Sequence, residues 1–560
     1  MSASESAQHL TPATADGTLP IDAPIRVDTA DSAPWEDSCD VLVVGCGAAG
    51  AAAAIVARES GADVRIVDRF EGGGATAKSG GVVYAGGGTS HQLKAGYEDT
   101  PEAMSAYLRQ ETGDAVSFDT LQKFCDDSRG LIEWLETMGA DFTSTAPPPK
   151  TSYPKDGIYL YYSGNEAVPA YARHALPAPR GHRTRGSWLS GKALYEFMRA
   201  RIDALKIPLL QQSSVRRLII DADQNVVGAE VWQLPPGSAA AREHQKLIRR
   251  AETIHNFSAS WADQLRAKAV VIELTHAQRV RVRARRGVIL STGGFIFNRE
   301  MVNRYAPKYA QTLRLGTAGC DGSGIRLGMS VGGVAARMEK VSAWRFINPP
   351  THWPKGIVVN QGGERFCNEQ VYGAKLGVEM CDNHQGRGWL ILDKTLRRAA
   401  LREALFGGLW FFQSVPAFFL MLFAPRARTP QKLAEKLDMP AAALSQTITS
   451  YNSTVAQGED ALGKAPAMRA PLQDAPYFAL NISADSKSFP CPAITLGGLR
   501  VDESSGTVLN ERGQPIAGLF AAGRTAVGVA SNYYVSGLSI ADCLWSGRRA
   551  GTHAAGSAKR

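Results

Sequence analysis

The sequence predicts an α/β protein in which a Rossmann-like nucleotide-binding domain carries an inserted α+β domain. Two observations support this prediction. The Val-rich run Asp40–Val44 passes directly into a glycine-rich turn and an alanine-rich stretch, as a buried parallel strand followed by a helix would. Near the other end of the chain, Gly518–Gly523 (GLFAAG) has the pattern of a further strand and turn. We therefore expect both ends of the chain to build one domain.

The expected domain organisation has four segments. Residues 1–37, rich in Ala, Ser, Thr, Asp and Pro, are expected to form a flexible tail. Residues 38–297 and residues 479–560 are expected to form the two parts of the nucleotide-binding domain. Residues 298–478 are expected to form the inserted domain, because the regular pattern of strands and helices ends there and Pro and Trp residues interrupt the sequence that follows.

The other elements follow in order along the chain. Ala51–Glu59 is a good helix former that ends at Gly61, and Asp63–Asp68 is a second short strand with an acidic end, which completes a βαβ unit. The pattern then predicts a glycine-rich loop at Gly72–Gly88, helices at Ala193–Ala204, Lys432–Lys436, Ala441–Asn452 and Gly537–Ala550, and strands at Ser213–Asp221, Val226–Trp232 and Arg286–Leu290.

Composition and charge disfavour several classes of protein. The net charge of +9 comes from Lys and Arg residues that are mostly scattered, so we expect no nucleic-acid partner. The eight cysteines are dispersed without a CxxC pair, which indicates neither a disulfide framework nor a metal site and fits a reducing compartment. The first 35 residues lack the basic and apolar regions of a secretory signal, so we expect a cytoplasmic protein.

One strongly apolar segment, Leu405–Ala424, stands out within the inserted region. It is borderline in length for a membrane-spanning helix and is interrupted by glycine, glutamine and proline. The segment could be a membrane-spanning helix or part of the buried core, and both interpretations stay open. We favour a third, a hairpin that dips into a membrane surface or covers the substrate. The flanking arginines suit an interface with anionic lipid, and they are Arg397, Arg398, Arg402, Arg426 and Arg428.

The turn after the first strand carries a dinucleotide-binding fingerprint. Gly45, Gly47 and Gly50 form G-x-G-x-x-G between a strand and a helix, where the helix N-terminus favours a pyrophosphate. Asp68 follows at about the 20-residue spacing at which a carboxylate binds ribose hydroxyls. The loop Gly72–Gly81 (GGGATAKSGG) supplies backbone donors for a flat ring system, which favours FAD over NAD.

At this point a family resemblance becomes specific. The chain resembles the succinate dehydrogenase/fumarate reductase flavoprotein superfamily, and within it the 3-ketosteroid dehydrogenases, from about Ser38 onward. The motifs that carry it are Val43–Gly50, Ala75–Thr89 (ATAKSGGVVYAGGGT), Ser291–Phe295 (STGGF), Gly363–Glu369 (GERFCNE), Thr495–Leu499 (TLGGL) and Gly518–Gly551. The resemblance implies a glutathione-reductase-like FAD domain.

The resemblance also implies which residues bind FAD. The cofactor should be non-covalent, because Gly72–Gly81 contains no histidine. Arg524 stands where the superfamily usually has Glu, so its contact must differ. The expected cofactor-binding residues are Gly45, Gly47, Ala48, Ala49, Gly50, Asp68, Arg69, Ala75, Thr76, Lys78, Ser79, Gly80, Gly81, Thr292, Gly293, Gly523, Arg524, Leu538, Ser539 and Ile540.

Departures from the superfamily pattern decide the subfamily. Fumarate reductases have an Arg that clamps a substrate carboxylate where this chain has Tyr534, so dicarboxylate chemistry is disfavoured. Tyr534-x-Ser536, with Tyr372 shortly after the GERFCNE motif, is similar to 3-ketosteroid Δ4-(5α)-dehydrogenases. Tyr533 and Gly537 also satisfy the spacing of Δ1-dehydrogenases, so both regiochemistries stay open and we lean to Δ4-(5α).

The expected chemistry is removal of an α-proton from a ketone and transfer of the β-hydride to flavin. By resemblance, Tyr534 and Ser536 abstract the proton, Ser536 relays it to solvent, Tyr372 handles protons near the substrate, and the Gly537 amide holds the 3-keto oxygen. The expected partners are a steroid or sterol-derived ketone and a quinone-type or other electron acceptor. A flavin-dependent enoate reductase and a membrane-associated flavin electron carrier without catalysis are the alternatives.

Overall fold

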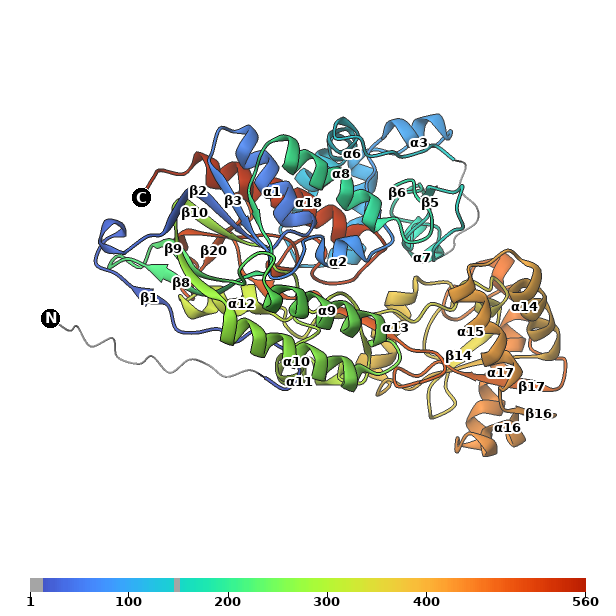
Figure 1. Cartoon of the computed structure of the whole chain (residues 1–560). Coiled ribbons are helices and arrows are strands. Elements are labelled where there is room, and N and C mark those ends of the chain that lie inside the picture. The colour runs from blue at the N-terminus through green and yellow to red at the C-terminus, as the bar shows by residue number, and fades with distance from the viewer. Residues whose placement is uncertain (1–13, 146–151) are drawn as a thin grey trace.

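The computed structural model describes residues 14–145 and 152–560, which form two lobes (Figure 1). The larger lobe is built on a nine-stranded sheet in the order β1-β8-β9-β10-β2-β3-β7, and β21, itself paired with β20, adds to β10. The strands are β1 (Ile25–Arg26), β2 (Asp37–Val44), β3 (Val64–Val67), β7 (Leu209–Leu210), β8 (Ser213–Ile220), β9 (Val226–Gln233), β10 (Gln278–Leu290), β20 (Thr507–Leu509) and β21 (Pro515–Ala521). The predicted α/β class with a Rossmann-like domain is confirmed.

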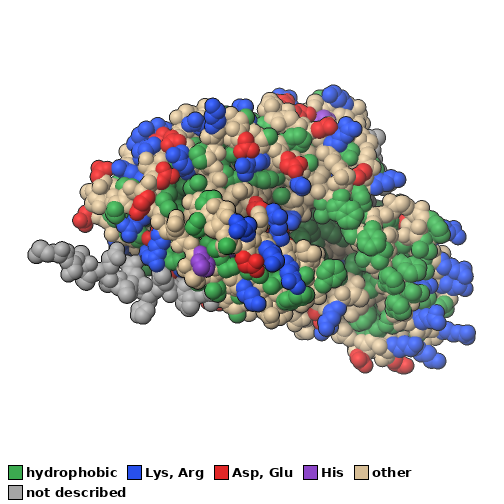
Figure 2. All heavy atoms as spheres, viewed as in Figure 1, with side chains coloured by type: hydrophobic (Ala, Val, Ile, Leu, Met, Phe, Trp, Pro, Cys, Tyr) green, Lys and Arg blue, Asp and Glu red, His purple; other side chains and the backbone are tan. Residues whose placement is uncertain are grey.

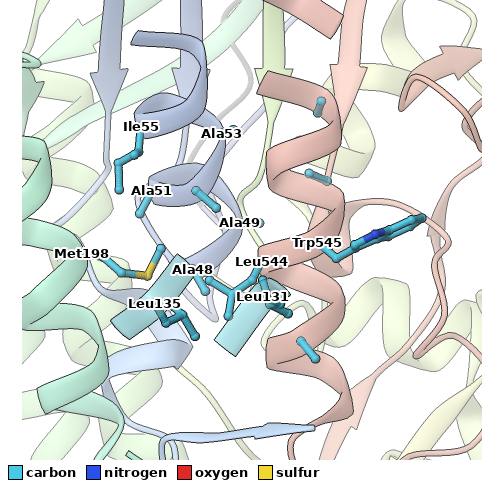
Figure 3. Close-up of a cluster of buried hydrophobic side chains, with 14 of the residues drawn as sticks. Ala48, Ala49, Ala51, Ala53, Ile55, Leu131, Leu135, Met198, Leu544 and Trp545 are labelled. Atoms are coloured by element: carbon cyan, nitrogen blue, oxygen red, sulfur yellow. The ribbon is translucent and has the colours of Figure 1, made fainter. Parts of the chain in front are cut away.

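The two ends of the chain meet at this sheet and on its face. The last strand, β21, pairs in parallel with β10, with Leu519 beside Val288. Helix α1 (Ala48–Glu59) lies beside the C-terminal helix α18 (Leu538–Gly556) (Figure 3). Alanine and glycine at the contact let the two helices approach closely, since a Cβ on Gly547 would stand 2.3 Å from the Ala49 carbonyl oxygen.

The large lobe contains further helices. They are α2 (Gly74–Ala77), α3 (Ser90–Lys94), α4 (Pro101–Thr112), α5 (Phe118–Asp126), α6 (Ser128–Thr137), α7 (Pro169–Ala172), α8 (Gly191–Ala204), α9 (Ala239–Ile254), α10 (Ala259–His276), α11 (Arg299–Tyr305) and α12 (Ser323–Ser330). Strands β4 (Val82–Tyr84), β5 (Leu160–Tyr161) and β6 (Gly181–Arg183) form a small sheet beside them. The glycine-rich loop predicted at Gly72–Gly88 thus contains α2 and β4.

The smaller lobe has its own sheet and core. Its strands pair in the order β14-β15-β17-β16, and they are β14 (Ile357–Val359), β15 (Trp389–Leu392), β16 (Arg426–Ala427) and β17 (Tyr477–Asn481). Its helices are α14 (Lys394–Phe406), α15 (Phe411–Leu422), α16 (Pro430–Lys436) and α17 (Ala441–Ala456). Helix α13 (Gly373–Asn383) lies between the lobes, with Leu376 in the core of the smaller lobe and Met380 and Cys381 in a core cluster of the larger one. One core cluster of this lobe runs from Ile347 to Ile482. The boundaries 298–478 of the inserted domain stay a prediction.

The N-terminal tail prediction needs correction. Residues 1–13 lie outside the described residues, but from residue 14 on the segment packs against the large lobe. The Leu19 amide donates to Asp321 over 2.9 Å, and Asp22 pairs with the buried Arg216 at 2.8 Å. Strand β1 then joins β8. Polar composition suggested a flexible tail, but this segment is held by charged partners far away in the sequence, so residues 14–37 are an ordered part of the lobe.

The apolar segment 405–424 forms parts of two helices joined by a short connection, not a single helix. It comprises the end of α14, a short connection and α15, and Pro416 lies inside α15 instead of ending it. In residues 14–145 and 152–560, no helix is both long enough and apolar enough to cross a membrane.

A buried histidine makes the large lobe sensitive to acid. His182 accepts from the Thr89 hydroxyl at 2.9 Å and donates from Nδ1 to the Arg180 carbonyl oxygen at 3.1 Å, so the neutral ring is satisfied. Burial lowers the pKa of His182 to about 3. Its contribution to stability is therefore complete above the unfolded pKa near 6.5 and is lost as the pH falls toward 3.

We expect acidification from pH 7 to pH 5 to lower the free energy of unfolding by about 2 kcal/mol through His182. Urea unfolding followed by tryptophan fluorescence at the two pH values measures this effect. In His182→Asn the difference between the two pH values should shrink by that amount. An unchanged difference in the variant would show that His182 does not titrate as its burial requires.

Candidate functional site

Two cavities meet between the lobes. The first, of about 540 Å³, opens at the carboxyl ends of β2 and β3 and the N-terminus of α1. The second, of about 500 Å³, is lined mainly by aromatic and aliphatic side chains of both lobes. Figure 2 shows the hollow between the lobes, with hydrophobic side chains around it. The residues that line both cavities are Ala75, Thr76, Lys78, Arg524 and Cys543.

The fingerprint turn has the geometry that a dinucleotide needs. Gly45 has a φ of +96°, which only glycine adopts without strain. A Cβ on Gly50 would stand 1.9 Å from the Gly45 carbonyl oxygen, so the turn and helix α1 pack in direct contact. The Ala48 amide donates to the Thr76 hydroxyl over 3.0 Å, which ties α1 to the glycine-rich loop. The N-terminus of α1 faces the first cavity and can receive a pyrophosphate.

Two predicted cofactor residues at the end of β3 already have protein partners. The Asp68 carboxylate accepts from the backbone amides of Cys46, Phe70 and Gly72, and burial raises its pKa. The Arg69 guanidinium pairs with Glu273 at 3.0 Å and with Asp321 at 2.9 Å. Both residues line the first cavity, but their side chains chiefly fix its wall.

The structure brings most of the predicted cofactor residues to the two cavities. Those on the first cavity are Gly45, Gly47, Ala48, Ala49, Asp68, Arg69, Ala75, Thr76, Lys78, Thr292, Gly293 and Arg524. Ser79, Gly80, Ser539 and Ile540 line the second cavity. Gly50, Gly81, Gly523 and Leu538 lie behind the linings. For example, a Cβ on Gly81 would stand 2.5 Å from the Ser190 backbone, so this glycine permits close packing.

The residues present fit FAD. Arg524 is partly buried where the cavities join, and it donates from Nη2 to the Cys320 thiol over 3.3 Å. Its Nη1 has no partner among the described residues, so a donor is available at the junction for a bound group. The first cavity can hold the dinucleotide, and the junction with the apolar cavity can place a flavin ring against a substrate.

Aromatic side chains converge in the second cavity. Tyr372, the residue before α13, and Tyr534 come from segments far apart in the sequence, and their ring centroids lie 6.4 Å apart. Tyr534 stacks on Trp344 at 5.2 Å. Burial raises the pKa of Tyr534 to about 12, although the Gly537 amide and the Arg524 charge act in the opposite direction. The phenol of Tyr534 is therefore protonated and able to donate at neutral pH.

Ser536 stands next to further hydroxyl groups. Burial raises the pKa of Tyr372 and that of Tyr161. The Ser536 hydroxyl lowers both pKa values, but its effect is smaller than that of burial. Tyr161, at the end of β5, is buried, and its Oη has no hydrogen-bond partner among the described residues. Tyr161 was not predicted from the sequence, because no local pattern indicates that it lies near Ser536. The two segments are far apart in the chain: Ser163, two residues after Tyr161, is separated from Ser536 by 373 positions.

Tyr533 points elsewhere. Of the described residues, the lining of either cavity includes Tyr534, Ser536 and Gly537 but not Tyr533. The Lys375 ammonium lies 3.7 Å from the centroid of the Tyr533 ring. The structure thus separates Tyr533 from the other candidate catalytic residues.

A cluster of aromatic side chains joins the two lobes beside the second cavity, which Phe412 lines. Trp188, on the large lobe, contacts Trp410 and Phe412 of the small lobe at centroid distances of 5.6 and 5.7 Å. Trp410 donates from its indole to the Pro154 carbonyl oxygen over 3.1 Å. Sequence analysis noticed Phe412 within an apolar segment, but it gave no signal for Trp188, since the contact joins separate lobes.

The chain has clear relatives. Residues 40–540 match the model of the FAD binding domain family. A 3-oxo-5-alpha-steroid 4-dehydrogenase of Comamonas testosteroni is 44% identical over 90% of this chain and 96% of that protein. The crystal structure of a 3-ketosteroid-delta4-(5alpha)-dehydrogenase from Rhodococcus jostii RHA1, in complex with 4-androstene-3,17-dione, is 29% identical, with a TM-score of 0.79, and covers 95% of this chain and 99% of that chain.

A more distant structure shares the fold. The 3-ketosteroid delta1-dehydrogenase of Sterolibacterium denitrificans is 21% identical, with a TM-score of 0.64 over 93% of this chain and all of that chain. The family match and the high identity over nearly the whole length agree with the motifs at both ends of the chain. The chain belongs to the FAD binding domain family, in the succinate dehydrogenase/fumarate reductase flavoprotein superfamily, together with the 3-ketosteroid dehydrogenases.

Proposed function

We propose that the protein is an FAD-dependent dehydrogenase that introduces a double bond between C4 and C5 of a 3-keto-5α-steroid. The observation that carries this proposal is the apolar cavity in which Tyr372, Tyr534 and Ser536 converge beside the cofactor cavity. Its volume of about 500 Å³ and its aromatic lining suit a rigid, flat, apolar substrate that presents one ketone. The relatives from Comamonas testosteroni and Rhodococcus jostii carry names that describe the same reaction.

Tyr534 and Gly537 are suited to hold the ketone oxygen. The phenol of Tyr534 stays protonated because its pKa is raised to about 12, and the Gly537 amide lies next to it. Two donors aimed at one carbonyl oxygen stabilise the enolate that develops when an α-proton leaves. Burial thus favours Tyr534 as a donor to the substrate rather than as the base.

Ser536 and Tyr372 are suited to take the proton. As the C4 proton moves to the Ser536 hydroxyl oxygen, the hydroxyl proton of Ser536 passes to the oxygen of a neighbouring phenol, Tyr372 or Tyr161, and that phenol releases its own proton toward solvent. The sequence suggested that Tyr534 and Ser536 abstract the proton together. In this proposal Ser536 takes the proton, and Tyr534 donates to the ketone oxygen instead. When bound, FAD supplies the acceptor of the hydride from C5.

The position of Tyr533 favours C4–C5 over C1–C2 oxidation. The Δ1 alternative needs Tyr533 at the substrate, whereas its ring lies under Lys375 and outside the cavity linings of the described residues. The enoate reductase alternative needs a guanidinium that clamps a carboxylate, and Tyr534 occupies that position. The third alternative, a flavin electron carrier without catalysis, would give no role to the hydroxyl groups of Tyr372, Tyr534 and Ser536 that converge in the cavity.

Product analysis tests the proposal. The protein is incubated with 5α-androstane-3,17-dione or with 4-androstene-3,17-dione, an electron acceptor is supplied, and the position of the new double bond is determined. The first compound should give 4-androstene-3,17-dione, and the second should remain unchanged. A new C1–C2 double bond in either product would establish the Δ1 alternative.

We also propose a membrane contact and a quinone acceptor. Leu405, Phe406, Phe411, Phe419, Leu422 and Phe423 form an exposed apolar surface, the α15 patch, beside the second cavity (Figure 2). Phe406 is 82% exposed and Phe423 76%. The exposed arginines at its edge, Arg398, Arg402, Arg426 and Arg428, complement anionic lipid headgroups. Steroid and quinone both dissolve in the lipid that this patch would contact.

Vesicle co-sedimentation tests the membrane contact. We expect the protein to bind phosphatidylglycerol vesicles, to bind phosphatidylcholine vesicles less, and to lose at least about tenfold in affinity when Phe406, Phe419 and Phe423 are replaced by serine. Phe257→Ser is the matched control, because Phe257 is 91% exposed on the large lobe. Equal binding by the triple variant and the control would rule out the α15 patch as the contact.

A further inference from the structure

A buried segment that lines neither cavity connects the two tyrosine-bearing parts of the site. Ser163–Glu166 (SGNE) follows β5, and each of its four residues is almost completely buried. Its side chains and backbone hydrogen-bond to residues of α4, to the segment before α18 and to Tyr372 before α13. No motif in the sequence marks this segment as functional.

Asn165 is the central residue of this segment. Its Oδ1 accepts the backbone N–H of Tyr372 over 2.6 Å, and its Nδ2 donates to the Glu111 carboxylate over 2.7 Å. Its own backbone N–H donates to the Tyr107 hydroxyl oxygen over 2.8 Å. The amide orientation is thereby fixed, because one side must accept and the other must donate. Asn165 is 1% exposed, so water does not compete for these bonds.

The same cluster holds the segment that carries Tyr534 and Ser536. The Glu111 carbonyl oxygen accepts from the Tyr533 backbone N–H over 3.1 Å and from the Asn532 side-chain amide over 3.0 Å. Ser163 accepts from the Ser536 backbone N–H over 3.1 Å and donates from its hydroxyl to the Ser536 carbonyl oxygen over 3.0 Å. Both ends of the catalytic segment are therefore bonded to one cluster.

The residues around this cluster are closely packed. A Cβ on Gly164 would stand 2.5 Å from the Tyr107 hydroxyl and 2.9 Å from Val535 Cγ1. Tyr372 precedes α13 and Tyr534 precedes α18, so their separation depends on contacts between segments that are distant in the sequence. The hydrogen bond from Tyr372 to Asn165 is such a contact, and it acts on the backbone of the residue itself.

We propose that Asn165 is a positioning residue that sets the phenol of Tyr372 against Ser536 and Tyr534 by linking the Tyr372 backbone to Glu111. The inference rests on the proposed function, in which Tyr372 receives the proton that Ser536 passes on. A misplacement of about 1 Å can cost about 100-fold in rate. Asn165 lines neither cavity itself, so its loss should affect the chemical step more than the binding of substrate or FAD.

The direct test uses Asn165→Ala as the FAD-bound protein. Rapid anaerobic mixing with 5α-androstane-3,17-dione gives the rate constant of flavin reduction and the substrate Kd. We expect the rate constant to fall by about 10- to 100-fold, with FAD content and Kd close to those of the wild type. Asn452→Ala is the control, because it also removes two side-chain bonds, both to the Leu472 backbone, but lies far from the site.

The result that overturns the proposal is a wild-type rate constant in Asn165→Ala, calculated per bound flavin. A lower melting temperature in both variants with unchanged reduction rates would likewise assign Asn165 a purely structural role. If 3-ketosteroids do not reduce the flavin of the wild type at all, the proposed function fails, and this inference falls with it.

Asn165→Asp provides a second readout, a pH profile. Aspartate can still accept from Tyr372, but it sets a second carboxyl group against Glu111, whose pKa burial already raises. At low pH the two carboxyl groups share a proton and the link is restored, whereas at high pH like-charge repulsion breaks it. The titratable groups that face Glu111 are Tyr107 on its own helix, Glu166, Tyr171 of α7 and Lys375 of α13.

We therefore expect flavin reduction in Asn165→Asp to approach the wild-type rate at low pH and to fall by about tenfold or more as the pH rises. The ratio of variant to wild-type rate constants isolates this effect from the pH dependence of the wild type itself. A ratio that does not change with pH would contradict the link between Asn165 and Glu111.

Discussion

Tyr534→Phe is expected to slow flavin reduction by a 3-ketosteroid about 100- to 1,000-fold while FAD binding persists. The substitution removes one of the two donors to the ketone oxygen, and loss of a single such donor costs about 3 to 4 kcal/mol of transition-state stabilisation. The phenyl ring can still stack on Trp344, whose ring centroid lies 5.2 Å from that of Tyr534, so the cavity should keep its shape. Stopped-flow reduction under anaerobic conditions measures the effect.

Tyr533→Phe is the matched control for this prediction. Its ring packs under the Lys375 ammonium, and phenylalanine preserves that contact. We expect a change of less than about threefold, since the lost hydroxyl is outside the proposed machinery. If Tyr533→Phe proves more damaging than Tyr534→Phe, the two tyrosines have exchanged roles and the Δ1-type arrangement is favoured.

The second large effect is the loss of the cofactor in Gly50→Ala. The added methyl group would stand 1.9 Å from the Gly45 carbonyl oxygen in the fingerprint turn and 2.6 Å from the Ser291 hydroxyl oxygen. The turn must move away from α1, which displaces the amides that face the pyrophosphate. We expect FAD affinity to fall by at least about 100-fold, which corresponds to about 3 kcal/mol.

The flavin absorbance of the purified protein and a titration of the apoprotein with FAD measure this loss. Gly130→Ala is the control, because Gly130 lies on α6 and a Cβ there meets no atom within 4 Å. Gly130→Ala should bind FAD as the wild type does. A yellow Gly50→Ala protein with normal affinity would show that the fingerprint turn tolerates a side chain and does not set the position of the cofactor.

The sequence was sufficient for features that depend on local pattern. The strand, turn and helix around Gly45–Gly50 were predictable because glycine spacing and alanine content act over a few residues. The closure of the sheet by Gly518–Gly523 was predictable because the segment repeats the same pattern at the far end of the chain. Family resemblance then supplied Tyr372, Tyr534 and Ser536, and the structure places all of them in one cavity.

Features that depend on tertiary contacts were not predictable. Tyr161, Trp344 and Asn165 reach the site only because distant segments pack together, and none lies in a periodic pattern or a motif. Asp68 and Arg69 have suitable residue types and spacing, yet the loop amides and the pair Glu273 and Asp321 occupy their polar atoms. The ordered stretch 14–37 was missed because its polar composition is the same whether or not charged partners hold it.

Anaerobic mixing of the FAD-bound wild type with 5α-androstane-3,17-dione tests directly whether this flavoprotein oxidises a saturated 3-ketosteroid. We expect the flavin to be bleached in one phase and an equal amount of 4-androstene-3,17-dione to appear. A flavin that stays oxidised with this ketone, in a preparation that dithionite reduces normally, would rule out 3-ketosteroid oxidation.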